Sequence, residues 1–557
     1  MAPEPLGNPK KSSNTVRAHP GWGYSSLRRG RDRLPPITHG VRASVLAPTS
    51  PQLEAMHPFA TQPFPHQLTE FDATKDKPWW GLFWEMGVAK TKVLIDTAAH
   101  LWLTGQIDGV LVLAPEGVHL QWVADEIPTH MPHIVQDKLD SLVWYTSKQT
   151  NKGFGERWRE FRDRPKADGL SILSMTYDSV MTQRKPGDPR GLQKGADAAK
   201  AFLTGRRVLL ILDESTRIKT PGTKITKRVL AMAKYATHRR IANGTPVADS
   251  PFHAYTQVKF LNPNAWRHLG IDDASGFETF FGVHERRINH ATQRHYNHLV
   301  AYRNLEVMNK VLTDHGSRLL KRDVFPDLPP KLYSRHYFDL IPKQAKHYKQ
   351  LATEMMTWLD NGELVSADLA IVRQTRLQQI CSGYLPADDE EELQPLVDPK
   401  DNPRLKALID LLTDVTGKVI IWAKYDIDVD LIAAACTNKL GWEVVTWDGR
   451  TSAPDRETAK RRFREGPARA FIAKASSSAG RGLNLQVADT VVYYNNSFVL
   501  DDRQQSEDRA HRPGIHHPVK YIDLIATGTI DEHILRSLRQ KRDVAAIVTG
   551  DSLAPWT

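Results

Sequence analysis

Short runs of apolar residues recur along the chain, separated by longer stretches with helical periodicity. In the amino-terminal half the clearest runs are 109–114, 170–175, 208–212 and 239–242. Short runs that are apolar at nearly every position are typical of parallel strands buried on both faces. Their alternation with helical stretches predicts an α/β domain whose sheet is covered on both sides.

The alternation stops near residue 262 and resumes at residue 418. Residues 262–330 are rich in His, Arg and Phe and show little strand signal, and residues 340–379 have the pattern of long amphipathic helices. Residues 388–403 are acidic and contain proline, which indicates a surface loop. Apolar runs return at 418–422, 442–446, 470–473, 490–494 and 519–524. We therefore predict a second α/β domain, with helical insertions between the two and a cleft where they meet.

These changes of pattern divide the 557 residues into five segments. They are a disordered basic amino-terminal arm (1–55), a first α/β domain (56–261), helical protrusions and a linker (262–402), a second α/β domain (403–545) and a carboxy-terminal tail (546–557). The arm is rich in Pro, Gly, Ser and Arg and has little apolar periodicity. Such an arm either scans nucleic-acid phosphates or only keeps the chain in solution.

Composition indicates the kind of partner and the cellular compartment. The formal net charge is +11, which favours a polyanion such as nucleic acid, although a single basic tail on an ordinary protein gives a similar balance. The two cysteines, Cys381 and Cys436, provide neither a zinc cluster nor a disulfide framework, which indicates a reducing compartment. No apolar run approaches the roughly 20 residues that cross a bilayer, and the amino terminus lacks a secretory signal. We expect a cytoplasmic protein with no membrane partner, in a microbial cell or a virus-infected host cell.

Two segments of the first domain suggest phosphate chemistry. Lys90-Thr91 opens a helical stretch, where backbone N–H groups, a mobile ammonium and a hydroxyl can receive phosphate and Mg²⁺. The generic glycine pattern of a phosphate loop is not met, so an ordinary helix start also fits. Asp213-Glu214 follows the apolar run 208–212, and carboxylates at the end of a buried strand need a cation or a polar network. The first acid suits Mg²⁺ and the second suits activation of water, although the pair also fits an ordinary helix cap.

Residues 471–534 suggest the other half of such a site. They contain two apolar strands, a loop of small residues and glycine, and a Gln-rich helix that carries Arg509 and Arg512. Arginines on a rigid helix suit the charge that develops on a transferring phosphoryl group.

In order, these pieces resemble the motifs of the SWI/SNF-type ATPases, a branch of the superfamily 2 helicases and translocases. The similar segments are 85–91 (EMGVAKT), 113–115 (LAP), 173–177 (LSMTY), 213–216 (DEST), 244–246 (GTP), 418–425 (KVIIWAKY), 479–485 (AGRGLNL), 505–512 (QSEDRAHR) and 528–532 (GTIDE). Two departures matter: Ala89 replaces the glycine before the lysine, and Thr216 replaces the histidine after the paired acids. Alanine is strained at position 89 if the backbone there needs a positive φ.

The resemblance implies two RecA-like parallel-sheet domains in tandem that bind ATP and Mg²⁺ between them. It implies catalytic roles for Lys90, Asp213, Glu214, Gln505, Arg509 and Arg512. It implies ATP contacts from Gln67, Gly87, Val88, Ala89, Lys90, Thr91 and Gly482, with Gln67 on the adenine edge and with Thr91 and Asp213 on Mg²⁺. It implies contacts to nucleic-acid phosphates from Pro115, Thr176, Lys424 and Asn484. Such contacts position a strand without reading its sequence.

The expected function is an ATP-dependent DNA translocase or helicase of phage or bacterial type that moves along or remodels duplex or branched DNA in replication, recombination or repair. Two alternatives stay open: a non-hydrolysing DNA-binding scaffold with a decayed phosphate loop, and an RNA helicase. The His- and Arg-rich run at 284–298 either contacts the second DNA strand or is a solvated face.

Overall fold

The computed structural model describes residues 59–146, 151–182, 194–289, 294–360, 367–386, 393–475 and 483–552. All of these residues belong to one compact unit, Ser50–Thr557. The predicted basic arm (1–55) and Gly482 lie outside the described residues. Within the described ranges, no helix combines the length and the apolar character that crossing a membrane requires.

The first lobe is built on a seven-stranded sheet in which every pair of neighbours is parallel. Its strands, in sheet order, are β3 (Leu139–Val143), β4 (Leu170–Thr176), β2 (Gly109–Ala114), β5 (Val208–Asp213), β6 (His238–Ala242), β1 (Trp79–Trp84) and β9 (Gly316–Leu319). The four strands predicted in this region are β2, β4, β5 and β6, so the α/β prediction is confirmed here.

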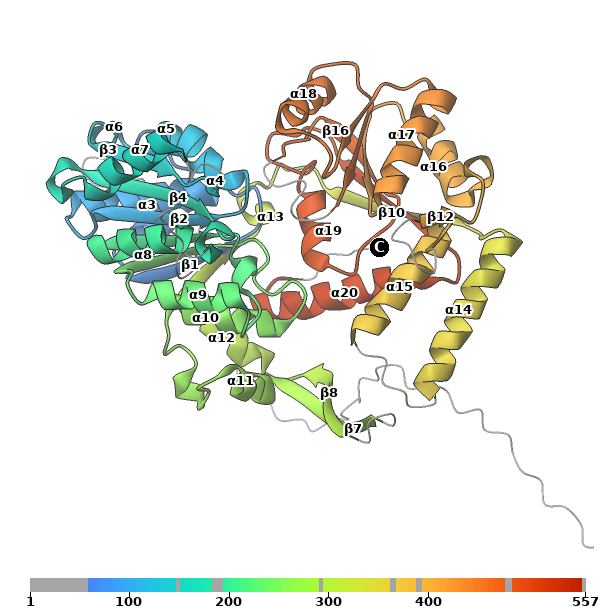
Figure 1. The fold of residues 1–557 in the computed structure, drawn as a ribbon, viewed down its shortest axis with the longest axis horizontal. Helices are drawn as coiled ribbons and strands as arrows, with labels where there is room; N and C mark the ends of the chain where they lie inside the picture. The colour runs from blue at the N-terminus through green and yellow to red at the C-terminus, as the bar shows by residue number, and fades with distance from the viewer. Residues whose placement is uncertain are drawn as a thin grey trace, which may run out of the picture. The chain divides into compact units, whose positions relative to one another are not determined.

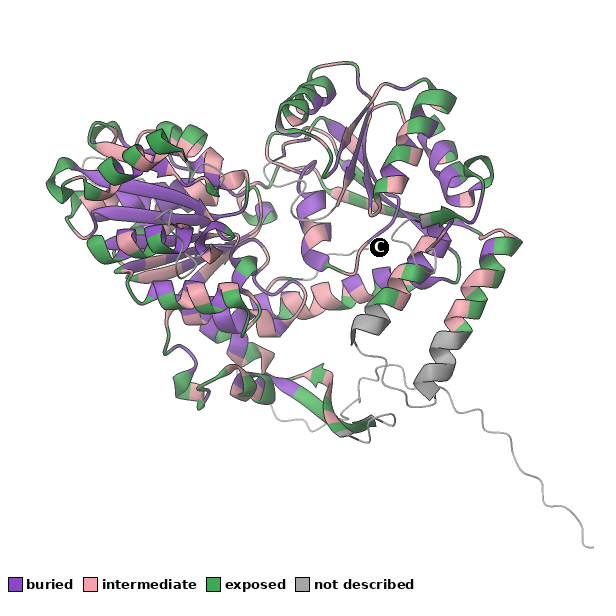
Figure 2. Ribbon diagram, in the orientation of Figure 1, coloured by how far each residue is buried: buried purple, intermediate pink, exposed green. Residues whose placement is uncertain are grey.

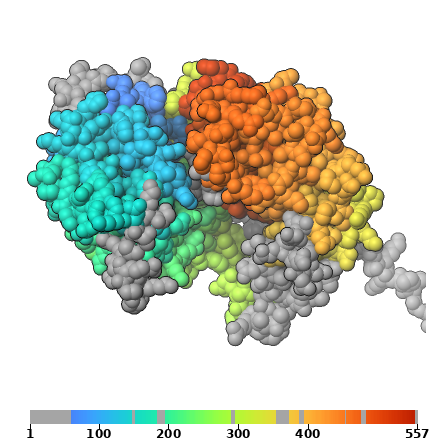
Figure 3. Space-filling view, turned by 45° about the horizontal axis from the view of Figure 1, so that its top comes forward, coloured from blue at the N-terminus to red at the C-terminus, as the bar shows by residue number. Residues whose placement is uncertain are grey.

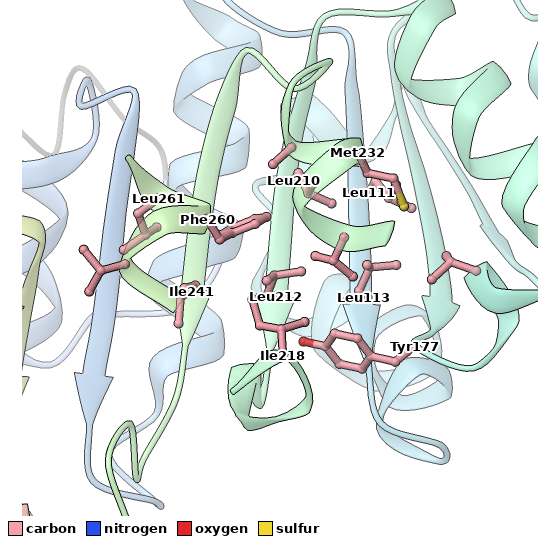
Figure 4. Close-up of a cluster of buried hydrophobic side chains, with 14 of the residues drawn as sticks. Leu111, Leu113, Tyr177, Leu210, Leu212, Ile218, Met232, Ile241, Phe260 and Leu261 are labelled. Atoms are coloured by element: carbon pink, nitrogen blue, oxygen red, sulfur yellow. The ribbon is translucent and has the colours of Figure 1, made fainter. Parts of the chain in front are cut away.

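Both faces of this sheet are buried, which explains why its strands are apolar at consecutive positions. On β5, Leu210 and Leu212 point into one core cluster, while Leu209 and Ile211 point into another on the opposite face. Figure 4 shows the first cluster, where side chains of β2, β5 and β6 meet those of the covering helices. Tyr177 closes the lower end of this cluster, and its hydroxyl donates to the backbone carbonyl of Asp213 at 2.9 Å. The core therefore fixes the end of β5, where the paired acids lie.

The second lobe is built on a six-stranded sheet, also parallel throughout. Its strands, in sheet order, are β10 (Lys331–Phe338), β17 (Val519–Ala526), β16 (Ala488–Tyr493), β13 (Lys418–Ala423), β15 (Ala470–Lys474) and β14 (Val444–Trp447). The five predicted strands of the carboxy-terminal half are all present. In Figure 2 the strands of both large sheets are mostly buried, and exposed residues lie on the outer faces of the helices.

Helices cover both sheets and join the lobes (Figure 1). Those up to residue 324 are α2 (Pro65–Thr74), α3 (Lys90–Leu103), α4 (Val118–Gln121), α5 (Ile127–His130), α6 (His133–Gln136), α7 (Lys152–Asp163), α8 (Gly195–Gly205), α9 (Lys224–Ala233), α10 (Ala254–Leu261), α11 (Ala274–Phe281), α12 (Leu305–His315) and α13 (Lys321–Val324). Those after it are α14 (Pro342–Asp360), α15 (Ala367–Ser382), α16 (Pro403–Thr413), α17 (Asp426–Leu440), α18 (Ala453–Arg464), α19 (Leu500–Glu507) and α20 (Ile530–Thr549).

The segment 262–402 is less helical than the sequence pattern predicted. It contains an antiparallel hairpin, β7 (Gly282–Asn289) with β8 (Arg294–Tyr302), and a short pair, β11 (Tyr384–Pro386) with β12 (Leu393–Pro395). It also supplies β9 to the first sheet and β10 to the second, so each predicted α/β domain takes a strand from beyond its predicted boundary. The long helices predicted at 340–379 are present as α14 and α15.

Two further expectations need correction. The predicted tail at 546–557 begins too early, because Ala546 and Val548 of α20 are buried and Asp551 forms an ion pair with Arg318 at 2.7 Å. The arginines of 505–512 do not lie on a helix: α19 ends at Glu507, residues 508–510 form a turn, and residues 511 and 512 continue as irregular chain. Pro513 follows, and Pro cannot donate the backbone bond that a continuing helix needs.

Candidate active site

The phosphate loop lies between β1 and the first turn of α3. Gly87 has φ = 77°, and Ala89, the residue before the helix, has φ = 56° and ψ = 49°. The Lys90 ammonium donates to the backbone carbonyls of Trp84 at 3.0 Å and of Glu85 at 3.2 Å. The loop therefore wraps around the lysine, and the amino terminus of α3 points its N–H groups into the same space.

The backbone at Ala89 has the positive φ at which, as stated above, alanine is strained. The backbone there is left-handed, a conformation that costs about 1–2 kcal/mol for a residue with a Cβ. The family glycine would adopt it without this cost. The loop has this left-handed conformation with alanine in place of the family glycine, so the backbone at Ala89 is strained.

Asp213 and Glu214 lie at the carboxyl end of β5, beside Lys90. The Trp122 indole N–H donates to Asp213 Oδ2 at 2.8 Å, and the Glu214 backbone N–H donates to the carbonyl of Ala242 at 2.9 Å. Glu214 has φ = 54°, a left-handed turn that ends the strand. Burial lowers the pKa of Lys90, while the negative charges of Glu214 and Asp213 oppose that shift. The structure thus brings together the three residues that the sequence predicted from separate segments.

Residues around the loop hold it in this shape. Gln67 is 2% exposed, accepts from the Phe64 N–H and donates to the Ala89 carbonyl, both at 2.8 Å. It therefore ties α2 to the loop, and its predicted contact with adenine stays a prediction. Val88 is buried and its carbonyl lies 3.2 Å from His66 Nε2.

Gly244, in the predicted segment 244–246, lies against the same loop. A Cβ on Gly244 would meet Met86 Cγ at 2.9 Å, so only glycine fits this close approach. The next residue, Thr245, donates its hydroxyl to Asp501 at the start of α19. This short segment therefore touches the phosphate loop on one side and the second lobe on the other.

The turn after α19 faces this site from the second lobe. Arg509 is 7% exposed, and Arg512 Nε donates to the backbone carbonyl of Asp508 at 3.1 Å. Gln505 is 2% exposed, and neither atom of its amide has a hydrogen-bond partner in the described ranges. The Leu485 N–H donates to the carbonyl of Arg509 at 3.0 Å, which joins the described end of segment 479–485 to this turn.

A cavity of about 750 Å³ is lined by both lobes. Glu85, Gly244 and Lys321 line it on one side, and Asp508 and His511 line it on the other. Figure 3 shows the surfaces of the first lobe, blue to green, and of the second lobe, orange, with a hollow between them.

Three of the four predicted nucleic-acid residues lie at strand ends, and Asn484 lies in the loop before β16. Pro115 is buried after β2, and the hydroxyl of Thr176, the last residue of β4, lies 2.7 Å from Ser179 Oγ. Lys424 follows β13 and donates to Gln378 Oε1 at 2.5 Å, and Asn484 Oδ1 accepts from the Gln486 N–H at 3.2 Å. Their roles on nucleic acid stay predictions.

The sequence did not reveal two cations of this region. Arg318 donates to the carbonyls of Phe83 at 2.6 Å and Gly244 at 3.0 Å, and Lys321 joins the two lobes. Neither cation carries a sequence pattern that separates it from surface residues.

Comparison with known proteins identifies the family. A profile described as "SNF2-related domain" matches residues 81–384, more than half of the chain, and one described as "Helicase conserved C-terminal domain" matches residues 403–514. The chain is 26% identical over 385 residues to the "TATA-binding protein-associated factor mot1" of Aspergillus fumigatus, with 62% of this chain and 20% of that protein covered. It is 25% identical over 473 residues to the "SWI/SNF-related matrix-associated actin-dependent regulator of chromatin subfamily A member 1" of Mus musculus, with 83% and 41% covered.

Among solved structures, the chain is similar to the "Sulfolobus solfataricus SWI2/SNF2 ATPase core in complex with dsDNA". The identity is 21% and the TM-score 0.36, with 88% of this chain and 94% of that chain covered. The chain spans about a fifth to two fifths of the length of the curated relatives named above. From the family profile and the two parallel-sheet lobes, the chain belongs to the SNF2-related family, the helicase-related ATPases of superfamily 2.

Proposed function

We propose that the chain is a DNA-stimulated ATPase that couples hydrolysis to movement along, or remodelling of, duplex DNA. The observation that carries this proposal is the meeting of Lys90, Asp213 and Glu214 at the amino terminus of α3. Phosphoryl transfer needs an ammonium on the phosphates, a metal-binding carboxylate and a group that orients water, and these three residues provide them.

The residues present fit ATP with Mg²⁺. Asp213 offers a carboxylate and Thr91 a hydroxyl beside a helix amino terminus, and Mg²⁺ prefers such oxygen donors together with nucleotide phosphates. A bound Mg²⁺ would neutralise charge on the phosphates. Lys90 would then move from the carbonyls of Trp84 and Glu85 to phosphate oxygens, and Glu214 would orient the attacking water.

The second lobe would complete the site. Arg509 and Arg512 would neutralise the charge that develops on the transferring group, so turnover depends on how the lobes close. Gln505 would gain partners for its buried amide in the closed state, because a buried amide without partners is unfavourable. Pro115, Thr176, Lys424 and Asn484 would hold DNA phosphates on both lobes, and the net charge of +11 supports a polyanionic partner.

Measuring ATP turnover with no nucleic acid and with single-stranded, duplex, forked and double-stranded RNA substrates tests this proposal. We expect the largest stimulation from duplex or forked DNA, and preference for the fork would favour a role in replication, recombination or repair. Binding of duplex DNA without stimulated turnover would instead favour the scaffold, and stimulation by RNA alone would favour an RNA helicase.

A further inference from the structure

One buried lysine contacts both halves of the proposed ATP site. Lys321 is 2% exposed, at the start of α13, where the chain passes from the first sheet to the second (Figure 1). Its backbone N–H donates to Glu85 Oε2 at 2.8 Å. Its ammonium donates to Asp508 Oδ1 at 2.7 Å and to the His511 carbonyl at 2.8 Å. A Cβ on Gly87 would lie 3.2 Å from Lys321 Cε, so the lysine also packs directly against the phosphate loop.

The contacts continue into the second lobe through alternating charges. Lys331 of β10 donates to Asp508 Oδ1 and to Glu507 Oε2, both at 3.1 Å. Glu507 also accepts from the Tyr333 hydroxyl and from Arg503 Nε, both at 2.8 Å. Burial alone would lower the pKa of Lys331, but Asp508 and Glu507 raise that pKa well above its usual value. The group is thus held charged inside the protein.

The same contacts lead on to the surface of the second lobe. Arg503 forms an ion pair with Asp523 and donates to Asn496 Oδ1 at 2.8 Å. The Asn496 backbone carbonyl accepts from Gln378 Nε2 of α15 at 2.8 Å. Gln378 Oε1 accepts from the ammonium of Lys424 at 2.5 Å. The series therefore ends at a residue predicted to hold a DNA phosphate.

Such a network responds to displacement as a unit. Most of its members are buried, and a buried charge that loses its partner is strongly unfavourable, so the contacts are kept together or exchanged together. A movement of Lys424 towards a phosphate would remove its bond to Gln378, and the effect would pass to Asn496 and Arg503 through the bonds described above. A contiguous series of hydrogen bonds and ion pairs is one physical means by which two sites can bias each other.

We propose that this series of side chains couples DNA contact to the ATP site. It runs from Lys424 and Gln378 through Arg503, Glu507, Lys331 and Asp508 to Lys321. In it, Lys321 and Lys331 are the positioning residues that hold 508–512 against the phosphate loop. This inference rests on the proposed function. It adds a route by which DNA would stimulate turnover: Lys424 would meet the DNA phosphate, and the effect would reach the phosphate loop through residues that touch neither DNA nor nucleotide.

Replacing Lys321 by methionine tests the route, because methionine keeps length and burial but loses the ammonium. We expect the ATP KM to change little, while the ratio of DNA-stimulated to basal kcat falls about tenfold, in the range of ordinary coupling between sites. The matched control is Lys92→Met, which breaks a buried Lys92–Asp96 pair of 2.9 Å inside α3. This control should lower stability to a similar degree but keep the ratio.

Gln378→Leu is the second variant, since it carries no charge and decides the question if Lys321→Met does not fold. It should lower the same ratio, and the double variant should lower it no further than the larger single effect, because both act on one network. Three results would each overturn the route. The first is a ratio that stays at the wild-type value in Gln378→Leu, and the second is an equal fall of the ratio in Lys92→Met and Lys321→Met. The third is a double variant of Lys321→Met and Gln378→Leu in which the two falls simply add. A wild-type protein that DNA does not stimulate would sink the proposed function itself, which is a different result.

Discussion

Replacing Ala89 by glycine is expected to stabilise the phosphate loop. Ala89 has φ = 56° and ψ = 49°, and a left-handed backbone costs a residue with a Cβ about 1–2 kcal/mol. Glycine also loosens the open chain, which offsets about 0.4–1 kcal/mol of that gain. The midpoints of these ranges leave a net stabilisation of ~0.8 kcal/mol, or a roughly fourfold change in the opening equilibrium.

Native-state amide hydrogen exchange across residues 86–93 measures this opening directly. Exchange in Ala89→Gly should be roughly fourfold slower than in the wild type. The control is Ala98→Gly, 2% exposed in the interior of α3, where glycine costs about 1 kcal/mol and should speed exchange. If both variants exchange faster than the wild type, the backbone at Ala89 is not strained and the reasoning fails.

The remaining predictions concern the site, a surface and a buried acid. Lys90→Ala should abolish ATP turnover while duplex affinity stays largely intact, and Arg512→Ala should spare ATP binding but stop hydrolysis. Arg286 and Arg287 are exposed on the β7–β8 hairpin, and a two-stranded ribbon fits the major groove. Removing both should weaken duplex binding. It should also reduce the slope of log affinity against log salt concentration by about 0.9 per lost phosphate contact. Burial raises the pKa of Asp428 to about 7, so stability should fall as the pH rises from 4 towards 7, and Asp428→Asn should flatten this melting-temperature profile.

Each of these outcomes has a contrary result and a control. Unchanged turnover in Lys90→Ala would exclude the proposed nucleotide site, and turnover in Arg512→Ala at the wild-type rate would exclude the role in charge neutralisation. Removing Lys152, 90% exposed on α7, together with Lys310, 76% exposed on α12, controls for the loss of two positive charges in the salt titration. An equal effect in that control would leave the hairpin with no special role. A wild-type melting profile that is flat between pH 4 and 7 would contradict the pKa of Asp428.

Most of the strands that the sequence predicted lie inside a sheet, with β14 as the exception, while β1, also inside a sheet, was not predicted. Residues 109–114 are apolar throughout because β2 has a neighbour on each side and helices above and below, and the predicted range equals the observed one. Edge strands carry less of this signal: β14, at one edge of the second sheet, was predicted, but β3, β9 and β10, at the other three edges, were not. β10 lies at the edge of the second sheet and is exposed at several positions, and its charged and polar residues, Lys331 and Arg335 among them, hide it from a search for apolar runs.

The same distinction applies to the site. Lys90, Asp213 and Glu214 stand beside helix and strand ends, so local sequence reveals them once phosphate chemistry is considered. Lys321 looks like any surface lysine, because its buried partner Asp508 is 187 positions away. Only the packing of α13 against the turn after α19 shows that this cation is enclosed.

The ion pair between Lys321 and Asp508 matters because residues 508–512, which carry Arg509 and Arg512, are not helical. A helix would hold Arg509 and Arg512 by its own hydrogen bonds, but a turn needs anchors from elsewhere. Asp508 provides several of them: its carboxylate accepts from Lys321 and Lys331, and its backbone carbonyl accepts from Arg512 Nε. The His511 carbonyl accepts from the same Lys321. Because Lys321 lies on the connection between the two sheets, we expect a change in that connection to reach Arg512 mainly through Asp508 and His511.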